Sequence, residues 1–510
     1  MTIKIILLII FFGMMIGVGF YSRRHATNVN DFVLGGRSVG PWLTAFAYGT
    51  SYFSAVVFVG YAGQFGWKYG ISTTWIGIGN ALIGSLLAWV ILGRRTRVMT
   101  KHLLAATMPD YFGKRFDSKN LRIVASVIVF VFLVPYTASI YNGLSRLFGL
   151  AFDVPYTACV VGMAILTGVY VIMGGYMATA INDFIQGIIM LVGIVAVIAA
   201  VLSGQGGFME AIRKLSEIPS DIPATANQVG AFSSFFGTDP LNLLGVVILT
   251  SLGTWGLPQM VQKFYSIKSE KAISTGTVIS TVFAIVISGG CYFLGGFGRL
   301  FDNPSIHNGD AIVYDGIVPY MISTLPDILI GIVVVLVLSA SMSTLSSLVL
   351  TSSSTFTLDF LKDNFIKDMS EKTQLLILRV LIVVFIVISV VLALDPPTFI
   401  AQLMGISWGA LAGAFLAPFL YGLYWKKVTK AAVWASFIVG IGITVSNMFF
   451  KYIASPINAG AVAMIAGMIV VPVVSLLTPK MEAKKVEEIF ACYNNEVKAT
   501  TKKVLPEERF

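Results

Sequence analysis

The sequence predicts an all-α protein that crosses a membrane many times. Hydrophobic residues make up 56% of its 510 residues and charged residues only 12%, whereas a soluble domain carries about 25% charged residues. Apolar runs long enough to span a bilayer, which takes about 20 helical residues, recur along almost the whole chain. Because lipid offers the backbone no hydrogen-bond partners, these runs are expected to be helices.

Thirteen apolar runs define the expected membrane-spanning helices. The first run ends at Arg23 and Arg24 without a signal-peptide cleavage pattern, so it is expected to be a retained helix. The ninth run is long enough to contain a spanning helix and an extension. The runs cover residues 3–21, 41–65, 70–93, 121–148, 154–178, 181–204, 239–262, 272–298, 318–356, 374–395, 398–425, 431–451 and 457–477.

Lys and Arg residues are concentrated in the loops that follow the odd-numbered runs. Because cations near helix ends stay on the cytoplasmic side, these loops are expected to face the cytoplasm. Lys263, Lys268 and Lys271 are counted among these loop cations, together with Lys367. The pattern places the N-terminus outside and the C-terminus inside, as an odd number of helices requires.

Several classes of function are disfavoured. The net charge is +10, but the cations are scattered over short loops rather than gathered on one face, which argues against nucleic-acid binding. The three cysteines form no CxxC pair. The chain contains no GxSxG, HExxH or Walker-type motif, so neither an enzyme nor an ATP-driven pump is expected. An ion gradient is then the remaining energy source for uphill movement of a solute.

Glycine and hydroxyl residues interrupt the second apolar run at residues 47–55. In hydrocarbon, polar groups must be satisfied internally, so such a cluster indicates a cavity or a helix contact. One interpretation is that the helix opens here. The alternative is that Gly49 and its small neighbours simply let two helices pack closely.

A ladder of hydroxyl groups lies near the middle of the ninth run. In a helix of about 3.6 residues per turn, Ala340, Ser343, Thr344 and Ser347 share one face, and Ser346 lies beside them. Hard cations such as Na⁺ prefer hydroxyl, carbonyl and carboxylate oxygens, so this face could hold sodium. The alternative is that each hydroxyl bonds back to a carbonyl of its own helix.

The sixth run begins near Asn182 and Asp183, with Gln186 one turn later. Asp183 could be a helix N-cap at the membrane surface. Alternatively, it faces the bundle and helps to retain a cation. An intramembrane carboxylate costs about 2.5–3.5 kcal/mol at the centre of a helix unless a partner or a function compensates.

Five motifs occur in a characteristic order along nearly the whole chain. They are DFVLGGRSVGP at 31–41, PDYFGKRF at 109–116, GGYMATAINDFIQG at 174–187, SMSTLSSLVLTSSS at 341–354 and GLYWKKVTKAAVWASFIVG at 422–440. Together they resemble the sodium:solute symporter family, whose bacterial members include proline, pantothenate, sialic acid and sugar symporters. The resemblance implies a symporter in the plasma membrane that is coupled to Na⁺ and imports a small organic solute. It leaves the oligomeric state open.

The resemblance also implies a five-plus-five inverted-repeat (LeuT-like) core within about thirteen helices. The first helix of each repeat would be interrupted at mid-membrane, near Gly49–Ser51 and near Gly253, Gly256 and Pro258. The expected units are a first helix with a cytoplasmic loop (1–40), the first repeat (41–204), an extracellular connection (205–238), the second repeat (239–425), two peripheral helices (426–477) and a cytoplasmic tail (478–510).

By the same resemblance, sodium would be bound between the second and ninth runs. The principal site would use the main-chain carbonyls of Thr50, Phe53 and Ala340 with the hydroxyls of Ser343 and Thr344. A second site, present in only some members, would use Ser343 together with Asp183, Ser346 and Ser347. The number of sodium ions, one or two, is left open.

The solute site implied by the resemblance draws on four helices. Its residues would be Ser51, Tyr52, Ser54, Trp75, Asn80, Tyr136, Thr137, Thr254 and Trp255. The chain departs from the proline type, which has an Asp in place of Tyr52 and a Trp in place of Val56, and from the sialic acid type, whose Arg is missing near Tyr136. The expected solute carries a carboxylate, as in pantothenate, a monocarboxylate or an amino acid like proline. The alternatives are sialic acid or a sugar, a transporter-like solute sensor and a passive uniporter.

Overall fold

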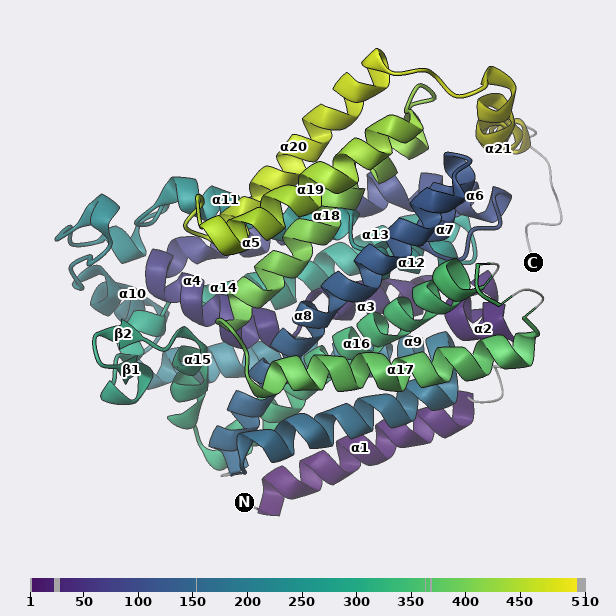
Figure 1. Cartoon of the computed structure of the whole chain (residues 1–510). Helices are drawn as coiled ribbons and strands as arrows, with labels where there is room; N and C mark the ends of the chain where they lie inside the picture. The colour runs from purple at the N-terminus through teal and green to yellow at the C-terminus, as the bar shows by residue number, and fades with distance from the viewer. Residues whose placement is uncertain (1, 23–27, 153, 363, 367–368, 502–510) are drawn as a thin grey trace.

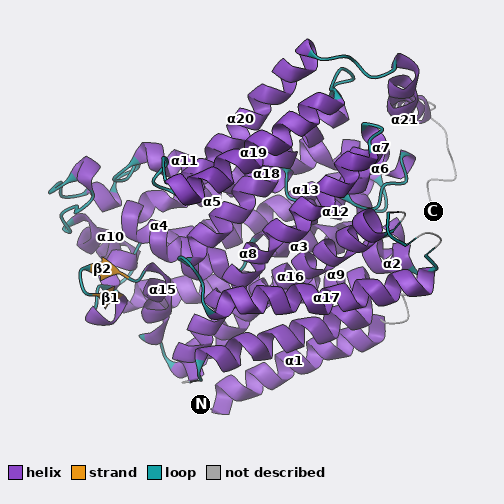
Figure 2. Cartoon of the chain, in the orientation of Figure 1, coloured by secondary structure: helices purple, strands orange, loops and turns teal. Residues whose placement is uncertain are grey.

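The computed structural model describes residues 2–22, 28–152, 154–362, 364–366 and 369–501. Within these ranges the chain is helical apart from loops and one small antiparallel hairpin, β1 (His307–Asn308) and β2 (Ala311–Ile312) (Figure 2). Ten described helical segments are long and apolar enough to cross a membrane, or eleven when one bent pair is counted as a span. Arg23, Arg24, Lys367 and tail residues 502–510 lie outside the described residues.

The helices of the N-terminal half are α1 (Thr2–Ser22), α2 (Val29–Leu34), α3 (Pro41–Tyr52), α4 (Ala62–Tyr69), α5 (Thr74–Gly79), α6 (Arg94–His102), α7 (Met108–Arg115), α8 (Lys119–Phe152), α9 (Tyr156–Gly204) and α10 (Phe208–Ser216). Short 3₁₀ or π segments extend or join them at Gly35–Arg37, Val56–Tyr61, Gly70–Thr73, Asn80–Leu87, Trp89–Gly93, Pro223–Thr225 and Ala231–Ser233.

The helices of the C-terminal half are α11 (Pro240–Leu252), α12 (Pro258–Ser266), α13 (Glu270–Ala284), α14 (Gly290–Gly295), α15 (Tyr314–Ser323), α16 (Asp327–Thr355), α17 (Glu371–Leu394), α18 (Ile400–Tyr424), α19 (Lys430–Phe450), α20 (Pro456–Leu477) and α21 (Ala483–Thr501). The short helical segments here are Gly253–Trp255, Ile285–Gly289, Gly298–Phe301, Pro304–Ile306 and Phe356–Leu361.

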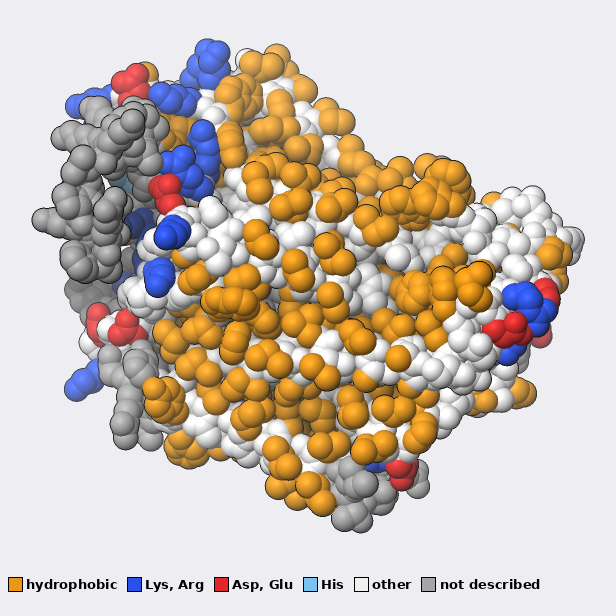
Figure 3. Space-filling model, turned by 180° about the vertical axis from the view of Figure 1, so that it is seen from behind, with side chains coloured by type: hydrophobic (Ala, Val, Ile, Leu, Met, Phe, Trp, Pro, Cys, Tyr) orange, Lys and Arg blue, Asp and Glu red, His pale blue; other side chains and the backbone are white. Residues whose placement is uncertain are grey.

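The helices form a bundle whose ends differ in surface composition from its middle. Figure 1 shows α10 and the hairpin at one end, and α2, α6, α7 and α21 at the other. Between the ends, the surface carries a broad band of apolar side chains, whereas Lys, Arg, Asp and Glu side chains gather at the ends (Figure 3). A continuous apolar band of this kind is the surface that a lipid bilayer covers.

Helices α16 and α18 occupy the interior of the bundle. Their most apolar windows are 78% and 89% buried, against 22% for α1 and 28% for α17. Helix α16 packs against α1, α3, α8, α9 and α17. The hydroxyl ladder of the ninth apolar run is therefore enclosed by protein on all sides, whereas α1 and α17 are among the helices that face lipid.

Two membrane helices are interrupted near their middles, as the resemblance implies. The first interruption falls at Phe53 and Ser54, between α3 and the π segment that leads into α4. It lies just after Gly49–Ser51, where the sequence places it, and Gly49 itself packs inside α3 against the ring of Phe283. The second interruption separates α11 from α12, which are bent by 40° at Gly256 and Leu257.

A glycine kink divides the longest helix. Helix α9 has 49 residues, but Gly175 within it has φ 54° and ψ −148°. A Cβ atom at this position would lie 2.8 Å from the carbonyl oxygen of Phe32, and only glycine tolerates both that dihedral pair and that contact. The sequence places this break between residues 178 and 181, three or more residues too late, because apolar residues continue through the kink.

The ninth apolar run is divided differently from the expectation. Residues 318–356 comprise the end of α15, a short turn at Thr324–Pro326 and the whole of α16. Pro326 precedes the first residue of α16, where a proline is compatible with a helix start. The expected extension is thus a separate helix that precedes the spanning one.

Candidate functional site

The first interruption is held against α16. The amide of Val57, which in a continuous helix would donate to the carbonyl of Phe53, donates to the carbonyl of Ser54 at 3.0 Å. The Phe53 carbonyl therefore loses its usual helical partner. On the other side, the hydroxyl of Ser341 in α16 accepts a hydrogen bond from the amide of Ala55 at 3.0 Å. This contact fixes the interruption beside the hydroxyl ladder.

Four of the five residues expected at the principal sodium site come together here. The Ser343 hydroxyl lies 3.0 Å from the carbonyl oxygen of Thr50 and 2.9 Å from that of Ala340. The Thr344 hydroxyl lies 3.2 Å and 3.0 Å from the same two carbonyls. Both hydroxyls do bond back to their own helix, as the alternative interpretation supposes, yet both also reach across to α3. Phe53 borders the same interruption.

This set of oxygens has the chemistry of a hard-cation site. Thr50, Ser343 and Thr344 are fully buried and Ala340 is 3% exposed. Each hydroxyl donates to a carbonyl here, but its lone pairs can turn toward a cation when the proton rotates away. Oxygen ligands without a soft atom among them suit sodium. A cation in this position would join α3 to α16.

The residues expected at the second sodium site include a buried carboxylate. Asp183 lies inside α9 and is fully buried, so the N-cap interpretation is wrong. Neither of its carboxylate oxygens forms a hydrogen bond with any described residue. The Ser346 hydroxyl donates to the carbonyl of Ser343 at 2.8 Å, and the Ser347 hydroxyl lies 2.8 Å from the hydroxyl of Ser51.

Lys263 contacts Asp183 and Ser347, and the three residues form a second cluster. Sequence reasoning missed Lys263. Counted from the sequence as a loop cation, Lys263 instead lies within α12 and is only 3% exposed. Its ammonium donates to the Ser347 hydroxyl at 2.9 Å and lies 3.8 Å from Asp183 Oδ2. The helix resumes as α12 after the second interruption, so Lys263 lies within a buried helix and not in a loop. Lys268 and Lys271 are exposed, as expected.

The predicted solute residues that meet near the first interruption are mainly aromatic. The ring of Tyr52 stacks on Phe53 at 4.3 Å and on Trp408 of α18 at 6.0 Å, and its hydroxyl donates to the carbonyl of Thr250. The Tyr136 ring meets Trp408 edge-on at 5.8 Å. Ser54 is buried beside them, and its hydroxyl accepts a hydrogen bond from the amide at position 56 at 3.2 Å. Rings from α3, α8 and α18 thus form one wall.

The second interruption is tied to the third apolar run. The Asn80 side chain donates to the Ser288 hydroxyl at 3.0 Å and accepts from the Ser251 hydroxyl at 3.2 Å. The Thr254 hydroxyl lies 3.2 Å from the carbonyl of Gly84, and the Trp255 indole donates to the carbonyl of Ile83 at 3.0 Å. Asn80, Thr254 and Trp255 therefore hold the two segments together, as side chains buried in one interface.

Three of the expected solute residues are placed elsewhere. Ser51 faces Ser347 and the second cation cluster. The Thr137 hydroxyl bonds to the carbonyl of residue 133 within α8. Trp75 lies in a peripheral groove and donates to the carbonyl of Phe235 in the loop before α11. The geometry thus gives these side chains structural partners away from the aromatic wall.

Several polar groups are buried at the centre, and of these only Tyr136 was expected from the family resemblance. The hydroxyls of Tyr61, Tyr136 and Tyr292 and the indole nitrogen of Trp408 form no hydrogen bond of normal geometry with any residue that the structure describes. Such groups are normally satisfied, so they indicate a place for a polar ligand or water. Their spacing along the chain carried no signal, because they lie in four different segments.

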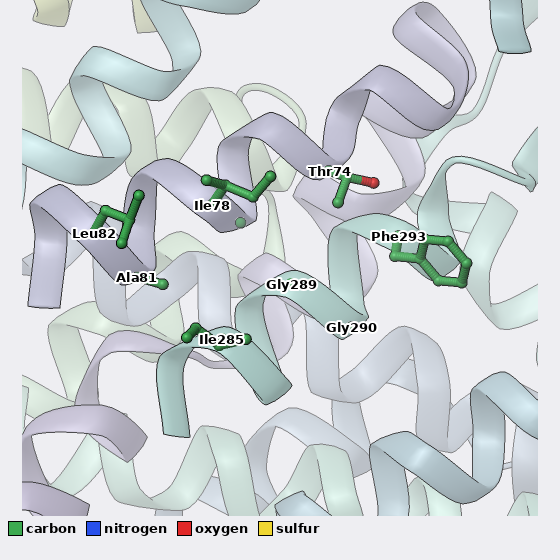
Figure 4. Close-up of a pocket in the computed structure, with 9 residues that line it drawn as sticks. Thr74, Ile78, Ala81, Leu82, Ile285, Gly289, Gly290 and Phe293 are labelled. Carbon is green, nitrogen blue, oxygen red and sulfur yellow. The ribbon is translucent and has the colours of Figure 1, made fainter. Parts of the chain in front are cut away.

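The apolar groove drawn in Figure 4 is a different feature. Ile78, Ala81 and Leu82 line one side, and Ile285, Gly290 and Phe293 line the other. The side chain of Thr74 is its one polar contribution among the lining residues. A groove of this composition at the rim of the bundle suits a lipid chain and offers nothing to bind a cation or a carboxylate.

Comparisons with known proteins identify the family. The model of the sodium:solute symporter family matches residues 32–440. The chain belongs to the sodium:solute symporter family. It is 30% identical to the osmoregulated proline transporter OpuE of Bacillus subtilis over 92% of this chain and 95% of that one. It is 29% identical to the sodium/proline symporter of Salmonella typhimurium, with 84% of each chain covered.

A solved structure has the same fold. The structure of a sodium-coupled sialic acid symporter in a substrate-bound, outward-open state superposes with a TM-score of 0.78 at 18% identity, and covers 94% of this chain and 98% of that one. This member of the family is therefore a multi-pass protein of the plasma membrane, and a transporter rather than an enzyme. It couples the movement of a small organic solute to that of Na⁺.

Proposed function

We propose that this symporter imports proline, or an amino acid of similar size and charge, with sodium bound among Thr50, Phe53, Ala340, Ser343 and Thr344. The observation that carries the proposal is the gathering of the Ser343 and Thr344 hydroxyls on the Thr50 carbonyl, directly beside the aromatic wall. The names of the two bacterial relatives, both proline transporters, support the choice of solute.

The chemistry of the aromatic wall fits a zwitterion. The expected solute residues apart from Trp75 are 6% exposed or less, and none of them carries a charge. Where the proline type has a carboxylate, this chain has Tyr52, whose ring is stacked between Phe53 and Trp408. The cationic nitrogen of an amino acid would be held by an aromatic ring of this wall. Its carboxylate would be held by the unpartnered hydroxyls and by helix ends at the interruptions.

Sodium and solute are linked through the first interruption. Residues 50 to 54 carry a sodium ligand at one end and face the solute wall at the other. A cation that joins α3 to α16 therefore stabilises the arrangement in which Tyr52 and Ser54 are presented to the solute. Binding of either partner favours the same conformation, which is the thermodynamic basis of coupling.

The proposed topology has thirteen helices, with the N-terminus outside and the C-terminus inside. A single helix of 49 residues would be about 73 Å long, more than twice the bilayer core, so α9 counts as two crossings divided at Gly175. The segment from 56 to 102 is divided at Gly70, which has φ 61°. With these divisions and the bent pair α11 and α12, the count reaches thirteen. The proposed repeats are then 41–204 and 239–425.

Reconstituted transport tests the function. Purified protein in liposomes is loaded with radiolabelled proline under an inward sodium gradient, or with choline in place of sodium. Sodium-driven accumulation that excess unlabelled proline abolishes is expected. Accumulation that choline supports equally would refute coupling and indicate a uniporter. Binding without any accumulation would indicate a sensor. Competition by pantothenate, lactate or sialic acid but not by proline would overturn the proposed solute.

A further inference from the structure

The buried ammonium of Lys263 stands where a second sodium ion would be expected. It lies 3.8 Å from Asp183 Oδ2 and donates to the Ser347 hydroxyl at 2.9 Å. Its nitrogen also lies 5.2 Å from the centre of the Tyr176 ring. Among the residues that the structure describes, Lys263 is the only cationic side chain within salt-bridge distance of Asp183.

The cluster can balance one positive charge, and Lys263 already supplies it. Asp183 is fully buried, and no second carboxylate adjoins it or Lys263 in a described ion pair. An ammonium and a sodium ion carry the same charge and compete for the same oxygens. A sodium ion added to the cluster would lie within a few ångströms of a like charge in a medium that screens poorly, which is unfavourable.

Lys263 is also held in place by its surroundings. Every residue of α12 is buried, and the helix packs against α3, α6 and α16. On either side of Lys263, the Gln262 side chain donates to the carbonyl of Val33 at 3.2 Å and Phe264 packs against Trp89 at 5.1 Å. The ammonium is therefore a fixed part of the cluster in this conformation.

We propose that Lys263 is a tethered cation that takes the place of the second sodium ion. The symporter then moves one sodium ion per solute, through the principal site alone. The inference rests on the proposed sodium-coupled function. It specifies the ion stoichiometry, which the family resemblance leaves open.

Lys263 also links four helices. From Asp183 in α9, the contacts run through Lys263 in α12 to Ser347 in α16 and on to Ser51 in α3. Ser51 follows directly after Thr50, whose carbonyl belongs to the principal site. The Lys263 ammonium thus supports the principal site through Ser347 and Ser51. A second sodium ion in its place would have to bind again in each transport cycle.

The wild-type protein gives the first test. In proteoliposomes held at zero membrane potential, opposing gradients of sodium and of radiolabelled proline are varied until net flux stops. With one sodium ion per solute, a tenfold sodium gradient balances an about tenfold solute gradient, whereas two ions would balance about a hundredfold one. A ratio of two in the wild-type protein overturns the inference. The absence of sodium-dependent flux for every solute would instead defeat the proposed function, so the two failures are distinguishable.

Variants give the second test. Lys263→Met removes the charge and keeps an unbranched apolar side chain, so Asp183 becomes available to sodium. The Hill coefficient for sodium should rise from about one toward two, and Asp183→Asn in the same background should reverse the rise. Lys263→Arg should behave as the wild type, as should Lys271→Met, which removes an exposed lysine. A folded, active Lys263→Met protein with an unchanged Hill coefficient refutes the inference. If that variant does not fold, the wild-type ratio decides.

Discussion

Removal of the Thr344 hydroxyl should weaken sodium binding without unfolding the protein. In Thr344→Ala, the principal site loses the oxygen that lies 3.2 Å from the carbonyl of Thr50 and 3.0 Å from that of Ala340. The Ser343 hydroxyl bonds to the same two carbonyls, so neither is left without a partner. The change therefore removes one cation ligand and leaves the contact between α3 and α16 in place.

The size of the effect follows from the number of oxygens that remain. A hydrogen bond to a charged group contributes about 1.5–3 kcal/mol, and loss of a comparable contact to sodium changes a binding constant about 10- to 150-fold. Water can enter the space left by the side chain and replace part of the contact. We therefore expect the sodium concentration for half-maximal uptake to rise by about tenfold, near the lower limit of that range.

The assay is the initial rate of solute uptake in proteoliposomes as a function of external sodium. Thr344→Ser keeps the hydroxyl and should restore the wild-type value. Ser353→Ala is a matched control, because Ser353 is buried on the same helix but bonds to the carbonyl of Val349 at 2.6 Å within that helix. A change of less than about twofold in Thr344→Ala, in protein that still transports, would refute the assignment of Thr344 as a ligand.

Three further predictions concern other parts of the molecule. Tyr136→Phe should raise the KM for the solute about three- to tenfold and leave the melting temperature unchanged, because the hydroxyl has no partner of normal geometry in the described chain; an unchanged KM would exclude a contact with solute. Gly175→Ala should destabilise the protein by about 1–3 kcal/mol, measured by thermal melting, whereas Gly162→Ala in the same helix, where a Cβ meets nothing within 4 Å, should not; equal melting temperatures would contradict the kink argument. Burial by itself would raise the pKa of Asp221, but hydrogen bonds and charge from Arg299 outweigh burial and hold that pKa below its ordinary value. The ion pair thus stabilises the fold above about pH 4, and this stabilisation is lost as the pH falls through the lowered pKa. The melting temperature of Asp221→Asn should therefore fall less on acidification than that of the wild type. Parallel plots of melting temperature against pH would count against the pair.

The cluster proposed as the principal sodium site could be predicted in part because its signals are local. Ser343 and Thr344 are adjacent on one helix face, and both lie inside a run that must be buried in lipid or protein. A hydroxyl pair there either bonds to its own helix or reaches a partner beyond it, and Ser343 does both, because it contacts the carbonyls of Ala340 and Thr50. The pairing of these hydroxyls with the Thr50 carbonyl, nearly three hundred residues earlier in the chain, was implied by the family resemblance.

Trp75 and Lys263 show where this reasoning fails. Trp75 lies in a run that was expected to line the solute site, but its own turn of the helix faces the peripheral groove. Lys263 was placed in a loop because the apolar run ends one residue before it. A hydropathy pattern reports how much of a segment avoids water. It does not report which neighbour a polar side chain at the end of that segment will meet.

The sequence by itself determined the solvent, the helical class and the apolar runs, because each of these follows from composition and spacing within about 20 residues. Where the two interrupted helices open was implied by the family resemblance. Only the tertiary structure decided that Lys263 meets Asp183 and that tyrosines from separate segments meet Trp408. Those contacts depend on how helices distant in the chain pack together. Packing is a property of whole surfaces in contact, and no single segment carries it.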